Sequence, residues 1–207
     1  MLKRTKGTIL LALLVVTGLA GVLQSNSLTK KERKLATDLC KESRNEVFKV
    51  VRGLSEAQLN FRPSAEQWSV KECVQHIALT EELLWNMLQE SAKKAPEPEK
   101  RSSVKLDDDQ VINMMRSRER KVKTFQKLEP VSAPWSDMPS TLKAFKDQRQ
   151  KLIQYLRTTT QDLRNHIIES PLGTVDAYQF ALLIPAHTQR HLQQIEEVME
   201  NENFPDR

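Results

Sequence analysis

The sequence contains little glycine and few aromatic residues. Only 5 of its 207 residues are glycine, and Phe, Trp and Tyr together make up 5%. No stretch alternates β-branched or aromatic residues with polar ones, which is the pattern of a half-buried strand. Long charged stretches with helical periodicity instead favour helices, so we expect an all-α domain without a sheet.

The excess of positive charge is also small. The formal net charge is +5, and three basic residues stand before an apolar run of 16 residues, Thr8 to Leu23. A basic start and an apolar run are typical of a secretory signal, which we place at residues 1–25. The run is shorter than the roughly 20 residues of a spanning helix, but an uncleaved membrane anchor remains the alternative.

Without these three charges the chain carries about +2, which is too little to predict binding to nucleic acid. We therefore predict an exported protein, periplasmic or secreted. Any membrane contact would run through residues 1–25 alone.

The two cysteines are not expected to form a disulfide. Cys40 lies 13 residues before Gly53, where the first helix should end, and Cys73 lies near the start of the next helix. These positions are about 20 Å and 6 Å from the connecting turn, whereas a disulfide needs Cα atoms within about 7 Å. Both thiols are expected to be small buried groups. A thiolate ligand at Cys73 is the alternative, because His76 follows three residues later.

Apolar residues recur at helical spacing in five stretches, which together predict one helical domain over residues 28–200. A charged segment with two prolines, residues 93–105, is a linker inside this domain, and residues 201–207 form a tail. The expected helices are 28–52, 69–92, 107–128, 140–156 and 175–200.

Two of the four histidines stand four residues apart on the last predicted helix. His187 and His191 therefore share a face with Ile184 and Ile195, and that face points to the interior. His76 lies on the inward side of the second helix, and three imidazoles with an open position form a common catalytic metal arrangement. The alternative is core histidines bonded to side chains or water.

Five other residues bear on this site. Thr80 and Gln194 are spaced to orient a ligand imidazole through its second nitrogen. Glu72 has the spacing of a capping box with Ser69, which is the interpretation we prefer. Glu81 is expected to be solvated, and His166 to lie outside the site.

Two segments resemble the ends of a DinB-like domain. LSEAQLNFRPSAEQWSVKECVQHIALTEE (54–82) is similar to its start, with a tryptophan–serine helix start and a histidine shortly after. DLRNHIIESPLGTVDAYQFALLIPAHTQRHLQQIEEV (162–198) is similar to its end, with the core H-x-x-R-H-x-x-Q-I. The resemblance implies an up-and-down four-helix bundle with a divalent metal (zinc, nickel or iron) on His76, His187 and His191.

The resemblance also implies a function and a partner. Known family activities include thiol-dependent S-transferases and a thiol-dependent isomerase, and members commonly dimerise, so a homodimer is expected. We predict an exported metal-binding protein that acts on a small molecule as a hydrolase or thiol S-transferase. The alternative is a metal-binding or structural bundle without catalysis, and no catalytic residue is predicted.

Overall fold

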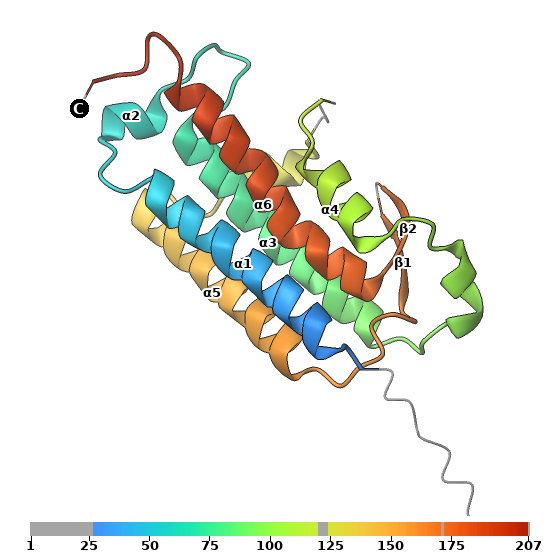
Figure 1. Cartoon of the computed structure of the whole chain (residues 1–207). Helices are drawn as coiled ribbons and strands as arrows, with labels where there is room; N and C mark the ends of the chain where they lie inside the picture. The colour runs from blue at the N-terminus through green and yellow to red at the C-terminus, as the bar shows by residue number, and fades with distance from the viewer. Residues whose placement is uncertain (1–26, 120–123, 171, 207) are drawn as a thin grey trace, which may run out of the picture.

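Four long helices form a bundle in the computed structural model, which describes residues 27–119, 124–170 and 172–206 (Figure 1). The signal predicted for residues 1–25 lies outside the described residues. Two of the long helices, α1 and α3, each pack against both of the others, α5 and α6, so the predicted four-helix bundle is confirmed. The four helices are α1 (Lys30–Val50), α3 (Val70–Ala92), α5 (Met138–Thr158) and α6 (Ala177–Met199).

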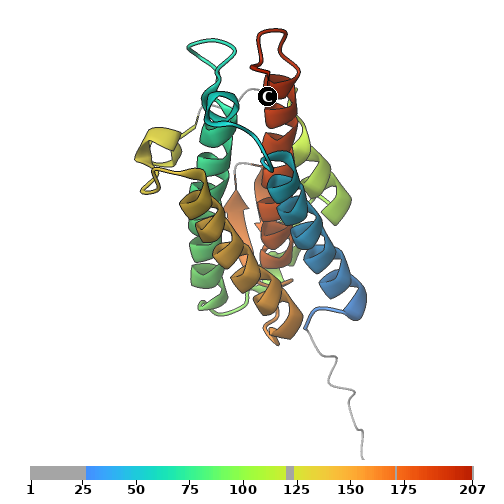
Figure 2. The same ribbon diagram turned by 90° about the vertical axis from the view of Figure 1, so that its left-hand side faces the viewer.

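The helices α1 and α6 run in one direction, and α3 and α5 run in the other (Figures 1 and 2). The strict up-and-down order implied by the resemblance is not present, because α3 and the next long helix, α5, run the same way: a long connection returns the chain along the bundle. A short helix, α2 (Glu56–Asn60), joins α1 to α3. The connection from α3 to α5 contains η1 (Pro98–Ser103), α4 (Asp108–Arg116), η2 (Gln126–Leu128) and η3 (Pro130–Ser132).

The prediction of a long third helix, 107–128, is wrong. The helix α4 starts as expected, with Asp107 as its cap, but ends at Arg116, and Ser117 is extended. Only the first part of the predicted helix, which is α4, has an apolar face, and this face packs against α6. Beyond Met115 the sequence is strongly charged, so a longer helix would bury little.

A small β-hairpin contradicts the expectation of no sheet. Strand β1 (Ile167–Ser170) pairs antiparallel with β2 (Gly173–Asp176), with Ile168 opposite Val175 and both side chains buried. Four residues per strand are too few for a visible alternation. Gly173 has a φ of 101°, a conformation that glycine adopts without strain.

A buried ion pair at the centre joins all four long helices. Arg149 of α5 is fully buried and binds both carboxylate oxygens of Glu81 on α3, at 2.5 and 2.6 Å. Its other donors reach the Cys40 carbonyl (2.9 Å) and the Ser43 hydroxyl (2.6 Å) of α1. The last contact is the Thr188 hydroxyl of α6, at 2.8 Å. All five N–H donors of the guanidinium are therefore paired.

We call these residues the Arg149 cluster, and it corrects the expectation for Glu81. That carboxylate is buried rather than solvated, and the reason is its partner on another helix. Burial lowers the pKa of Arg149, but the attraction of Glu81 outweighs this and raises it, so the guanidinium stays charged. No helix within the described residues combines the length and apolar character that crossing a membrane requires.

Candidate metal centre

His76, His187 and His191 come together where α3 packs against α6. His76 is on the inner face of α3, and the other two lie one above the other on α6. The Nε2 atom of His187 is 3.3 Å from that of His76 and 3.1 Å from that of His191. Among the described residues these three form a group whose potential ligand atoms all lie within 4.8 Å of one another.

The second nitrogens of two of these rings face hydrogen-bond acceptors. His76 Nδ1 lies 2.8 Å from the carbonyl oxygen of Leu128, and His191 Nδ1 lies 3.0 Å from the side-chain oxygen of Gln194. An acceptor at Nδ1 places the hydrogen there, because a carbonyl oxygen cannot donate. The Nε2 atoms of both rings therefore present lone pairs toward His187.

This donor set fits a divalent cation. In a tetrahedral site with metal–nitrogen bonds of roughly 2.0–2.1 Å, two nitrogen ligands lie about 3.3 to 3.4 Å apart. The Nε2 separations of 3.3 and 3.1 Å are close to that value. Imidazole nitrogens suit zinc, nickel and iron, whereas calcium and magnesium prefer oxygen.

The surroundings keep the three imidazoles neutral. Burial lowers the pKa of His76, and it lowers the pKa of His187 and His191 well below the ordinary value of 6.5. The neighbouring histidines and Arg190 lower the pKa of the two α6 histidines further. Neutral imidazole is the form that binds a metal, so at pH 7 the three rings can act as metal ligands.

Trp68 covers one side of the cluster. It lies just before α3, and its ring centroid is 4.8 Å from that of His76 and 6.1 Å from that of His191. The contact restricts both imidazoles and keeps water from that side. Sequence reasoning named Trp68 only as part of the helix start, and it missed the Leu128 carbonyl, which no side-chain pattern could indicate.

The predicted supporting residues divide into two groups. Gln194 bonds His191 as expected, and the Thr80 hydroxyl lies 3.4 Å from His76 Nε2, at the edge of hydrogen-bonding range. Glu72 instead completes a capping box with Ser69, as we preferred. Predicted to lie outside the site, His166 is not part of the group.

The cysteines stay separate from this site. Cys40 and Cys73 are free and buried, as predicted. Burial raises the pKa of the Cys40 thiol to about 12 and raises the pKa of Cys73 as well. Cys73 is not part of the histidine group, so the thiolate alternative is not supported.

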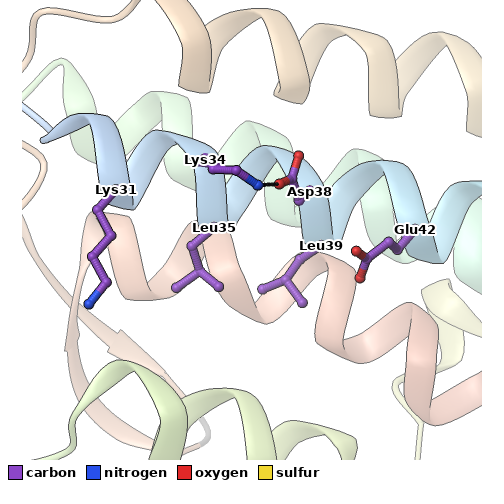
Figure 3. A pocket seen from close by; sticks show the side chains of 6 residues that line it. All are labelled: Lys31, Lys34, Leu35, Asp38, Leu39 and Glu42. Atoms are coloured by element: carbon purple, nitrogen blue, oxygen red, sulfur yellow. Dashed lines mark hydrogen bonds and ion pairs between the residues drawn. The ribbon is translucent and has the colours of Figure 1, made fainter.

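A surface hollow lies on α1, and no histidine is among its lining residues (Figure 3). Charged side chains surround two half-buried leucines there, and Lys34 pairs with Asp38 at 2.5 Å. Because α1 contributes no histidine, this hollow is not the candidate metal centre. Its lining residues are Lys31, Lys34, Leu35, Asp38, Leu39 and Glu42.

The fold and the facing imidazoles define a four-helix-bundle protein with a candidate three-histidine metal centre built between α3 and α6. The chain belongs to the DinB superfamily, which its sequence matches over residues 39–195. This confirms the resemblance seen in the sequence.

Two similar proteins come from Bacillus subtilis. YuaE, from strain 168, is 28% identical over 161 residues, which cover 77% of this chain and 94% of YuaE. The solved structure of YfiT superposes with a TM-score of 0.57 at 15% identity, over 84% of this chain and 89% of YfiT. YfiT is described as a probable metal-dependent hydrolase with an unusual four-helix bundle topology. At this identity the likeness establishes the fold alone.

Proposed function

We propose that this protein is a metal-dependent hydrolase whose divalent ion binds His76, His187 and His191. The observation that carries the proposal is the meeting of the Nε2 atoms, with separations of 3.1 and 3.3 Å, while Nδ1 of two rings faces a carbonyl oxygen. Three protein ligands leave a tetrahedral ion one position for water or substrate. Zinc, nickel and iron all suit this donor set.

The residues around the centre have separate tasks in this proposal. A bound divalent ion would supply Lewis acidity, lowering the pKa of a water molecule and polarising a substrate carbonyl or phosphoryl group. The Leu128 carbonyl and Gln194 hold the Nδ1 hydrogens and so keep two rings in the metal-binding tautomer. Trp68 covers one side of the rings of His76 and His191.

Hydrolysis is favoured over thiol transfer for two reasons. The fold is shared with YfiT, which is described as a probable hydrolase. An exported chain would also be separated from the cytosolic low-molecular-weight thiols that such transferases use. A thiol S-transferase would need its thiol as a second substrate, and a non-catalytic metal-binding bundle is the remaining alternative.

A substrate screen tests the proposal. The purified chain is stripped with chelator, reloaded with zinc, nickel or ferrous iron, and assayed on ester, amide and phosphoester substrates. A parallel set contains a low-molecular-weight thiol and an electrophile. We expect hydrolysis that needs the metal and is lost in His187→Ala. Metal-dependent thiol transfer alone would favour the S-transferase, and a loaded protein inactive in both sets would favour the non-catalytic bundle.

We also propose that the protein is exported and forms a homodimer. The basic and apolar pattern of residues 1–25 supports export, and the family resemblance supports the dimer. Cell fractionation with N-terminal sequencing of the recovered chain tests the first proposal. Light scattering of the purified protein tests the second, with a monomeric mass as the contradicting result.

A further inference from the structure

Gln194 shares one oxygen between two donors. Its side-chain oxygen lies 3.0 Å from His191 Nδ1 and accepts a hydrogen bond from Arg118 Nη1 at 3.3 Å. Arg118 follows α4, and its side chain is 24% exposed. Its Nε and Nη2 donate to the two carboxylate oxygens of Glu197, at 2.8 and 2.7 Å. Glu197 lies three residues after Gln194 on α6, so the guanidinium is held by two points of one helix.

This geometry selects one orientation of the Gln194 amide. The oxygen and nitrogen ends of an amide have nearly the same size, and either could face His191. A guanidinium can only donate, so it favours the orientation in which the oxygen is turned toward it. The same oxygen faces His191 Nδ1, which must then carry the hydrogen.

The reversed amide would place the hydrogen on the wrong ring nitrogen. An NH2 group facing His191 needs Nδ1 as an acceptor, and the neutral ring then carries its hydrogen on Nε2. That hydrogen would point at His187, 3.1 Å away, and would oppose a cation at the centre of the cluster.

We propose that Arg118 is a positioning residue of the metal centre, which sets the tautomer of His191 by fixing the orientation of the Gln194 amide. Arg118 touches no histidine in the described contacts; its hydrogen bond to the site goes to Gln194, and its positive charge also lowers the pKa of His191. The inference rests on the proposed metal binding and adds to it a contact from outside the four long helices. The connection after α4 thereby takes part in preparing the site.

Zinc affinity separates this role from a structural one. Dissociation constants are measured by competition with a chromophoric chelator for the wild type, Arg118→Met and the control Arg62→Met. Arg62 forms a comparable pair with Glu72 but bonds no partner of a histidine. Losing a direct partner of a metal ligand costs roughly 10- to 100-fold in affinity, and we expect about three- to ten-fold for Arg118→Met. The midpoints of urea unfolding, measured with chelator present, should be the same for Arg118→Met and Arg62→Met.

A rescue variant makes the test specific. In Arg118→Met with Gln194→Glu, both side-chain oxygens can accept from His191, so orientation no longer matters and zinc affinity should recover. Wild-type protein that binds neither zinc, nickel nor ferrous iron would overturn the proposed function, and this inference with it. Zinc binding by the wild type with equal affinity in Arg118→Met and Arg62→Met would overturn the inference alone. Failure of Gln194→Glu to restore affinity would also count against it.

Discussion

The bundle contains two polar clusters side by side, since Thr188 of the Arg149 cluster directly follows His187. In the Arg149 cluster five donors meet five acceptors, and the charges of Arg149 and Glu81 cancel. In the histidine cluster the imidazoles turn Nε2 atoms toward one another at 3.1 and 3.3 Å. The Nδ1 atoms of His76 and His191 face the oxygens of Leu128 and Gln194. The positive charges of neighbouring arginines disfavour protonation of His187.

This difference in hydrogen bonding and charge indicates that the Arg149 cluster stabilises the fold and that the histidine cluster binds a ligand. A buried polar group is stable when its hydrogen bonds and charge are satisfied, and the chain satisfies the Arg149 cluster by itself. Lone pairs that converge are stabilised by a cation, and the potential ligand atoms of the three histidines lie within 4.8 Å of one another. The first cluster should thus matter for stability under all conditions, and the second should respond to metal and pH.

The largest expected effect is on the Arg149 cluster. Arg149→Met leaves Glu81 buried without its partner, which costs about 3–5 kcal/mol in the free energy of unfolding. The loss should be the same with zinc present or after chelation, apart from the shift that zinc gives every folded variant. Urea denaturation followed by circular dichroism measures both conditions.

Two variants control for this result. Lys143→Met removes an exposed pair with Asp147 on the same helix and should change stability little. Combining Arg149→Met with Glu81→Leu removes both charges and should recover part of the loss, because an apolar pair avoids the unpaired charge. A double variant as unstable as the single one would show that the charge is not the cause.

The next effect concerns metal-linked stability. A metal that binds only the folded state at 100 times its dissociation constant adds about 2.7 kcal/mol to the free energy of unfolding. The wild type should lose this increment on chelation, and His191→Ala should lack it from the start. Thermal melts with zinc and with chelator measure the difference.

His166→Ala is the matched control for that experiment. His166 is also buried, with 5% of its surface exposed, but it lies outside the cluster. Its loss can lower the melting temperature through packing, yet the shift on chelation should equal that of the wild type. A wild type whose melting temperature ignores both zinc and chelator would contradict metal binding.

A further effect is a pH dependence of the metal-free protein. The pKa values of the three histidines are lowered by folding, so below pH 6.5 the unfolded chain binds protons that the folded chain does not. Stability should therefore fall as the pH drops from 6.5 toward the folded-state pKa values, by at most about 1.4 kcal/mol per pH unit and group. His187→Ala should show a shallower slope between pH 6.5 and 5, and equal slopes would contradict the buried neutral cluster.

The sequence predicted the histidine cluster because the pair on α6 is a local signal and the family resemblance joined His76 to it. The four-residue spacing of His187 and His191, the apolar face they share and the place of His76 beside Ile77 are all visible without a structure. Glu81 was misjudged because its burial depends on Arg149, which is 68 residues away and on another helix. The end of α4 and the short hairpin depend on what those segments pack against, and a periodicity of a few residues does not reveal this.

The most direct test of the central claim is the metal content of protein purified without chelator. The account predicts one divalent ion per chain in the wild type, in His166→Ala and in Lys143→Met, measured by mass spectrometry of digested samples against protein concentration. His76→Ala, His187→Ala and His191→Ala should each contain far less, also after incubation with zinc and removal of the excess. A wild type without bound metal after such incubation, or histidine variants that retain a full equivalent, would contradict the account.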